Sequence, residues 1–346
     1  MRGFLTVFFL IWFMILPGAA AAEPAGNPPD LAALLGFYQS EGESLLVRER
    51  EGALELLYAV SRNDYAFNRC NILQMVKIRY DEYSVIAASP RDYRLTMAAK
   101  FERGRDGRGI TLVIDKRRFG RVFVPNEKGG EVFRLSLPQP LEVMRRAALA
   151  AEMPRQGDDL PAAELVEITA VDPAIKTALV YATDGNAVGA PVYEQGRAFL
   201  DAAAARALSR VNRQISAHGY GLLVWDAYRP WYITKLLHDI LPPDKKYMLE
   251  APETGSPYNR GLSVSVSLYS LATGEEIAMI TGLDEPSPRA YSKFQGGGEL
   301  ERYRRDLLRF FMQSEGFSGV EHEWWHFDYK DFGKYRLLNK PFAQLP

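Results

Sequence analysis

Close to the C-terminus, Glu321-His322-Glu323-Trp324-Trp325-His326-Phe327 combines carboxylate, imidazole and aromatic side chains within seven residues. The carboxylate of Glu323 stands three residues before the imidazole of His326, among two tryptophans and a phenylalanine. A carboxylate is a candidate general base, and neutral histidine is the most common protein ligand for metals. The same pattern also suits a buried aromatic cluster whose polar groups are only hydrogen-bonded. The rest of the chain has to decide between a catalytic centre and such a core.

The composition is that of a globular protein. The 346 residues are 47% hydrophobic and 25% charged, which is enough apolar material for a core, and the length favours two domains. A net charge of -1 argues against non-specific nucleic-acid binding. The single cysteine, Cys70, excludes an intramolecular disulfide and a cysteine-rich zinc site.

Residues 1–22 have the pattern of a secretory signal peptide. Arg2 precedes an apolar run over residues 4–16, and Ala20-Ala21-Ala22 offers a small-residue cleavage site. The run is short for a membrane span, so an uncleaved anchor is the less favoured alternative. No other segment of the sequence is long and apolar enough to cross a bilayer. We therefore expect a secreted or periplasmic protein with no membrane span after cleavage.

Residues 23–30 form a proline-rich linker, and residues 31–137 predict an all-β accessory domain. Residues 45–58 read as two strands around a Glu51-Gly52 turn, and further strands are expected at 110–114, 121–125 and 131–135. This pattern favours a small antiparallel barrel or sandwich. The region contains no group of residues that suggests catalysis. Contact with a protein partner is the role that we expect for it.

Residues 138–161 predict a short helix and a linker, and residues 162–346 an α+β domain. Strands are expected at 165–168, 222–225 and 264–269, and helices at 197–218, 231–240 and 307–315. Pro230 would stand in the first turn of the second helix, where its missing N–H costs nothing.

Three motifs follow one another in the C-terminal half: Trp225-Asp226-Ala227-Tyr228-Arg229-Pro230, then the stretch from Ser256 to Ser265, then Glu323-Trp324-Trp325-His326-Phe327. Tyr181 lies in a fourth stretch upstream of them. In this order the motifs resemble the VanX-type D-alanyl-D-alanine dipeptidases, zinc peptidases related to D,D-carboxypeptidases and to the hedgehog fold. The resemblance covers roughly residues 160–346. It implies a hedgehog/D,D-peptidase-like α+β domain with a small antiparallel sheet.

In that family the pattern Ser-x-His-x-x-Gly-x-Ala-x-Asp is followed downstream by Glu-x-x-His. The two histidines and the aspartate bind zinc, the glutamate is the general base, and an arginine stabilises the oxyanion-like transition state. Three protein ligands leave the fourth zinc position for a water whose pKa falls toward 7. Carried over, the resemblance implies Glu323 and Arg229 as catalytic residues and His326 as a metal ligand.

The other two ligand positions differ from the family pattern, because Tyr258 and Ser265 occupy them. A serine hydroxyl is barely ionised at neutral pH, and a phenol with a pKa near 10 would first have to lose its proton. One histidine with a phenol and a hydroxyl is not a zinc site of useful affinity. We therefore expect no cofactor.

Two functions follow from these residues. The first is a pseudoenzyme that binds a small cell-wall peptide such as D-Ala-D-Ala, with Arg229 taking its carboxylate and Glu323 its ammonium group. The second is an active zinc D,D-dipeptidase whose metal site is rebuilt from His322, His326 and Asp284. If Arg229 binds no ligand, the alternative is a structural ion pair with Asp226 or with Glu323. Besides Arg229, Glu323 and His326, the expected cleft residues are Tyr181, Asp226, Ser256, Tyr258, Ser265, Trp324 and Trp325.

Overall fold

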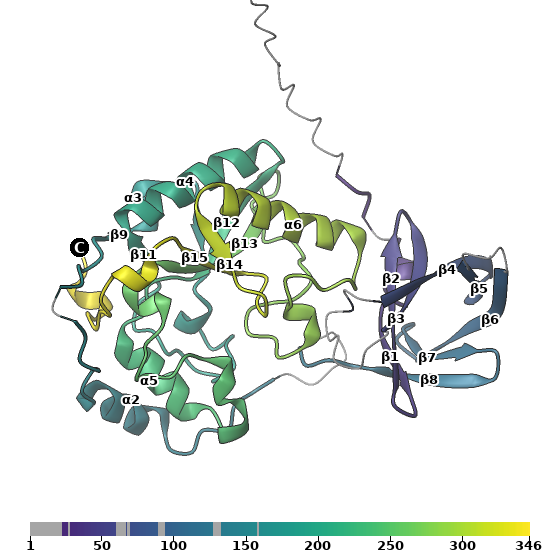
Figure 1. The fold of residues 1–346 in the computed structure, drawn as a ribbon, viewed down its shortest axis with the longest axis horizontal. Coiled ribbons are helices and arrows are strands. Elements are labelled where there is room, and N and C mark those ends of the chain that lie inside the picture. Colours follow the sequence, from purple (N-terminus) through teal and green to yellow (C-terminus); the bar gives the residue numbers. More distant parts are fainter. Residues whose placement is uncertain are drawn as a thin grey trace, which may run out of the picture.

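The computed structural model describes residues 23–26, 28–59, 67, 70–88, 94–126, 133–157 and 159–346. A β-barrel lies beside a larger α+β domain (Figure 1). The expected signal peptide lies outside the described residues, and so does the first part of the strand expected at 131–135. Residues 133–135 are described and are not in a strand.

The N-terminal domain is a closed antiparallel barrel, which decides between the two predicted β architectures. Each strand pairs with the next, and β1 pairs with β8 to close the sheet. Inward side chains such as Leu56, Val85, Phe101 and Leu112 form its core. The strands are β1 (Gly36–Ser40), β2 (Glu43–Arg50), β3 (Ala53–Ala59), β4 (Cys70–Arg79), β5 (Glu82–Ala88), β6 (Arg94–Arg103), β7 (Gly109–Ile114) and β8 (Arg117–Val122).

Two N-terminal predictions need correction. The strand expected at 121–125 is β8, which begins four residues earlier, because Asp115, with φ 52°, starts a tight turn that pairs Arg117 with Ile114. The sequence does not reveal that start, because residues 116–118 are all charged and show no alternation of apolar and polar side chains. The expected linker also contains the beginning of α1 (Pro29–Ala32), whose Leu31 is buried in the barrel core.

The C-terminal domain places a five-stranded sheet among helices (Figure 1). The strand order is β10-β12-β13-β15-β14, with only the β10–β12 pair parallel, and β9 pairs separately with β11. The elements are α2 (Leu141–Ala150), β9 (Leu165–Glu167), α3 (Ile168–Val171), β10 (Lys176–Thr177), β11 (Phe199–Asp201), α4 (Ala202–Ser216), β12 (Tyr220–Asp226), α5 (Trp231–Ile240), β13 (Ser263–Ser270), α6 (Glu299–Ser314), β14 (Phe317–Gly319) and β15 (His326–Tyr329).

Helix α5 has the bounds that the sequence predicts, but α4 and α6 do not. Residues 199–201 form β11, and α4 begins only after Asp201, whose side chain accepts a hydrogen bond from the N–H of Ala203 (2.9 Å). Helix α6 begins eight residues before the expected start. Its first turn is fixed by Glu301, whose carboxylate accepts from the N–H of Gly298 (2.8 Å).

The barrel is fastened to the first turn of α6. Glu49 on β2 is buried, and its carboxylate accepts from the N–H of Gly52 (2.6 Å) and of Glu299 (2.9 Å). Arg302 donates to the backbone carbonyl of Glu49 (2.7 Å). An apolar cluster that includes Leu46 of the barrel and Phe294 of the larger domain packs at the same contact. Within the described part of the chain, no helix has the length and apolarity to cross a bilayer.

Candidate functional site

Three neighbouring strands bring the predicted site residues together. Ser265 on β13 stands opposite Asp226 on β12 and, on its other side, opposite His326 on β15. Directly opposed residues in antiparallel strands have Cβ atoms about 4.5–5.5 Å apart. The β-sheet register thus places residues 39 to 100 positions apart in the sequence within one side chain's reach.

Tyr258 reaches the same place from a 3-10 turn, Pro257–Arg260. Its hydroxyl lies 2.6 Å from Oγ of Ser265, and its ring centroid lies 4.8 Å from that of His326. Gly261 ends the turn at φ 71°, a left-handed conformation that favours glycine. The three positions that the family resemblance assigns to zinc ligands are therefore in contact.

A cleft of about 660 Å³ opens over these residues. Of the residues that the sequence predicts for the cleft, Tyr181, Asp226, Arg229, Tyr258, Ser265, Glu323, Trp325 and His326 line it.

The predictions for Ser256 and Trp324 were wrong, since neither belongs to the cleft lining among the described residues. Ser256 is buried, and its Oγ caps the turn by accepting from the N–H of Tyr258. Trp324 is buried beneath the site, where its indole N–H donates to the hydroxyl of Thr281 (2.7 Å).

His326 is held between two carboxylates. Its Nδ1 lies 2.9 Å from Oε2 of Glu323 and its Nε2 lies 3.0 Å from Oδ1 of Asp328. Burial alone would lower the pKa of His326, but the hydrogen bonds to Asp328 and Glu323 outweigh burial and raise it to about 10. At neutral pH the ring is therefore an imidazolium that donates from both nitrogens, so a metal would have to displace a proton and a carboxylate to bind it. Sequence reasoning missed Asp328, although residues i and i+2 of a strand share one face.

Arg229 is buried and pairs with Asp226 rather than Glu323, so only the first of the two expected ion pairs is found. Tyr193, which sequence reasoning did not assign to the site, completes the group. Its hydroxyl donates to Asp226 (2.5 Å) and accepts from Nε of Arg229 (3.3 Å). The guanidinium carbon lies 5.1 Å from the ring centroid of Tyr181 and 4.8 Å from that of Tyr258. The arginine is thus fixed against the floor of the cleft.

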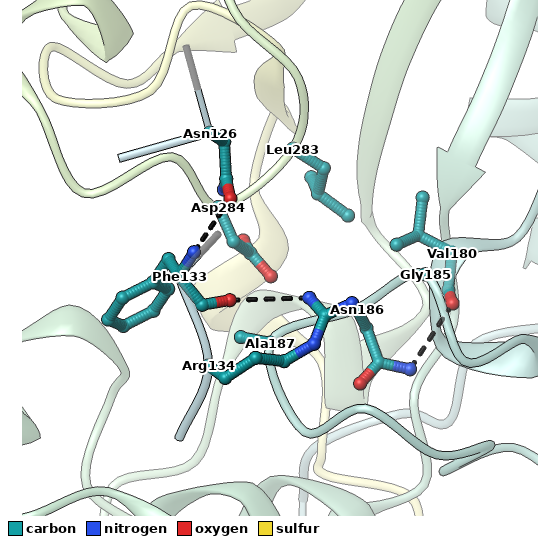
Figure 2. A pocket seen from close by; sticks show the side chains of 9 residues that line it. All are labelled: Asn126, Phe133, Arg134, Val180, Gly185, Asn186, Ala187, Leu283 and Asp284. Carbon is teal, nitrogen blue, oxygen red and sulfur yellow. Dashed lines mark hydrogen bonds between the residues drawn. The ribbon is translucent and has the colours of Figure 1, made fainter. Parts of the chain in front are cut away.

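Asp284 is a second carboxylate of the cleft, and the hydroxyl of Tyr181 donates to it. Burial raises the pKa of Asp284 to about 6, and the negative charge of Glu323 adds to that effect. Asp284 also lines a smaller side pocket of about 160 Å³, where it faces Arg134 and Asn186 (Figure 2). It therefore stands at the junction of two cavities.

These donors do not match a zinc site. Burial holds the pKa of the Tyr258 phenol well above its usual 10, so it stays protonated beside Ser265. Both ring nitrogens of His326 are engaged by carboxylates. In the alternative ligand set, His322 is exposed and packs edge-on against Tyr291, with ring centroids 5.0 Å apart. Among the residues that the structure describes, no group of three or more His, Cys, Asp or Glu side chains is placed to hold a metal ion.

The sequence comparisons with known proteins agree with one another. A family model described as D-ala-D-ala dipeptidase matches residues 161–346, which leaves the barrel outside the match. The D-alanyl-D-alanine dipeptidases of Enterococcus faecalis and Escherichia coli are 33% and 30% identical to this chain, each over 180 residues. That of Enterococcus faecium is 31% identical over 169 residues. The three alignments cover 47%, 52% and 44% of this chain and 85%, 92% and 84% of those proteins.

Proposed function

Since this chain belongs to the D-ala-D-ala dipeptidase family through residues 161–346, we propose that it is a metal-free member that binds a small cell-wall peptide such as D-Ala-D-Ala. The observation that carries the proposal is the environment of His326. Its two nitrogens face Glu323 and Asp328, so the one family ligand that is kept is already fully hydrogen-bonded. Glu323, which would act as the general base, is bound to the same ring.

The cleft residues do not replace the missing chemistry. Ser265 would need a base to become a nucleophile, but the hydroxyl of Tyr258 is its contact in the cleft, and that phenol is held protonated. Hydrolysis therefore has no activated water or hydroxyl among these side chains.

The same residues suit a small zwitterion. Arg229 uses Nε and Nη2 for Tyr193 and Asp226, and among the described residues nothing accepts from Nη1, which can bind a peptide carboxylate. Two carboxylates, Glu323 and Asp284, each use one oxygen, for His326 and for Tyr181 respectively, and the other oxygen of each can accept from an ammonium group. The cleft thus holds groups of both charges, which can bind the carboxylate and the ammonium group of a short peptide.

The test combines metal content, turnover and binding. Elemental analysis of the purified protein should give no stoichiometric zinc, and D-Ala-D-Ala should bind without release of D-alanine. Binding can be followed by tryptophan fluorescence, because Trp325 lines the cleft. Asp284→Asn should weaken binding at least tenfold, whereas Asp331→Asn, a change at an exposed surface residue, should not.

The outcome also decides the competing function. An active zinc dipeptidase rests on family membership, and stoichiometric zinc with release of D-alanine would establish it and overturn our proposal. A folded protein that binds no zwitterionic peptide would refute the binding role itself. We also propose secretion, on the pattern of residues 1–22, and N-terminal sequencing of the mature protein tests it.

A further inference from the structure

The segment that leaves the barrel, residues 133–137, runs along the cleft of the other domain. Phe133 and Leu135 both line the cleft. The N–H of Leu135 donates to the carbonyl of Ala187 (2.8 Å), and the N–H of Phe133 donates to Oδ1 of Asn126 at the end of the barrel (2.8 Å). This wall of the cleft therefore comes from a part of the chain that the family match does not include.

The cleft is larger and more apolar than a dipeptide with methyl side chains requires. Cavities of about 300–1,000 Å³ enclose drug-sized ligands, and this one measures about 660 Å³. Its charged groups, such as Arg229, Asp284 and Glu323, suffice for the two ends of a zwitterion. Leucine and methionine side chains, among them Leu241 and Met248, line other parts of it. Part of the cleft thus remains for an apolar group of the ligand.

We propose that Phe133 and Leu135 form an apolar subsite, and that the ligand is a zwitterionic dipeptide with one apolar side chain larger than methyl, such as leucine. The proposal rests on the proposed function and deepens it, because it states what the peptide carries besides its two charged ends. Each further methylene buried in an apolar pocket improves binding about tenfold or more. The barrel then takes part in selecting the ligand through the segment that leaves it.

Binding measurements on the full chain test this subsite. D-Ala-D-Ala, D-Leu-D-Ala, D-Ala-D-Leu and D-Lys-D-Ala are titrated by calorimetry or tryptophan fluorescence. One of the two leucine dipeptides should bind at least tenfold more tightly than D-Ala-D-Ala. Phe133→Ala and Leu135→Ala should remove most of that advantage, so that each variant binds the leucine dipeptide about as tightly as it binds D-Ala-D-Ala. Phe310→Ala and Leu271→Ala, at exposed positions elsewhere, are the matched controls and should change neither affinity.

Each result has a separate meaning. If D-Ala-D-Ala binds but neither leucine dipeptide binds more tightly, or the lysine dipeptide binds best, the subsite proposal is refuted and the proposed function stands. The same holds if the leucine advantage survives both substitutions in variants whose circular dichroism is unchanged. If no zwitterionic peptide binds the folded wild type, the proposed function fails and the subsite proposal fails with it.

Discussion

A zinc site should return when its two missing ligands are restored. Tyr258→His combined with Ser265→Asp would place an imidazole and a carboxylate next to His326. The geometry supports this, because Ser265 is the β-sheet partner of His326 and the ring of Tyr258 lies 4.8 Å from the His326 ring. Two histidines and one carboxylate, with a fourth position open, form a common ligand set for zinc.

The expected stabilisation can be worked out from what is lost and gained. The double variant loses the Tyr258–Ser265 hydrogen bond, about 1 kcal/mol, and brings a new carboxylate close to Asp226, so it should be less stable than wild type without metal. Zinc must also displace a carboxylate from one nitrogen of His326. At a zinc concentration about 1,000 times the Kd, binding adds about 4 kcal/mol to the free energy of unfolding. For a domain of this size that is an increase in Tm of roughly 8–16 °C.

The assay compares thermal unfolding of the double variant with zinc, with magnesium and with a chelator, and adds elemental analysis after dialysis. Tyr258→His alone, Ser265→Asp alone and Tyr258→Phe with Ser265→Ala are the controls. None of them should bind stoichiometric zinc. A double variant that has the wild-type circular dichroism and binds no zinc would show that Tyr258 and Ser265 do not occupy the ligand positions.

The remaining predictions concern the structure that supports the site. The pKa of Asp284 is raised from 3.8 to about 6, so between these pH values the folded protein holds a proton that the unfolded chain has released. The free energy of unfolding should therefore fall by about 1–3 kcal/mol as the pH rises from about 4 to about 7. Urea denaturation across this range should show a smaller fall for Asp284→Asn, and equal falls would contradict the assignment. Glu49→Ala should cost about 2–4 kcal/mol, because two backbone N–H groups lose their acceptor at the contact between barrel and helix, whereas the exposed Glu51→Ala should cost under about 0.5 kcal/mol. Gly261→Ala should lower the free energy of unfolding by about 2–4 kcal/mol, because φ is 71° and a leucine methyl lies 2.4 Å from the added Cβ. Gly219→Ala, at φ 82° with open space around the added Cβ, should lower it by only about 1 kcal/mol. Similar losses of stability in the two variants would mean that the clash at Gly261 is relieved.

Features with a local cause were the ones that the sequence predicted well. Helix α5 follows Pro230 and carries an apolar face, and both signals lie within its own residues. The strands around the Glu51-Gly52 turn were also visible, since a turn with positive φ at both residues separates two apolar runs. Helix α6 was only half found. Its first eight residues are mostly charged or polar, and they are held in place by contacts with the barrel that no local pattern shows.

In the candidate site, too, the sequence predicted what has a local signal and missed what depends on distant contacts. The motifs placed Arg229 and His326 in one site, but the partner of each was decided by the fold. Arg229 pairs with Asp226 instead of Glu323, because the end of β12 turns into α5 and keeps residues 226 and 229 together. Tyr193 joins this pair from a loop more than 30 residues away. Spacing in the sequence carries no information about such a contact.

The hydrogen bonding of the cleft explains how a site with replaced ligands remains stable. A buried polar group without a partner costs about 1–3 kcal/mol, and a buried charge costs more. Tyr258 is paired with Ser265, Arg229 with Asp226, and the His326 imidazolium with two carboxylates. Nη1 of Arg229 is the donor of this group that no described residue engages. The substituted side chains are therefore paired with protein groups alone, and Nη1 of Arg229 is left for a ligand, in agreement with the proposed binding of a peptide carboxylate.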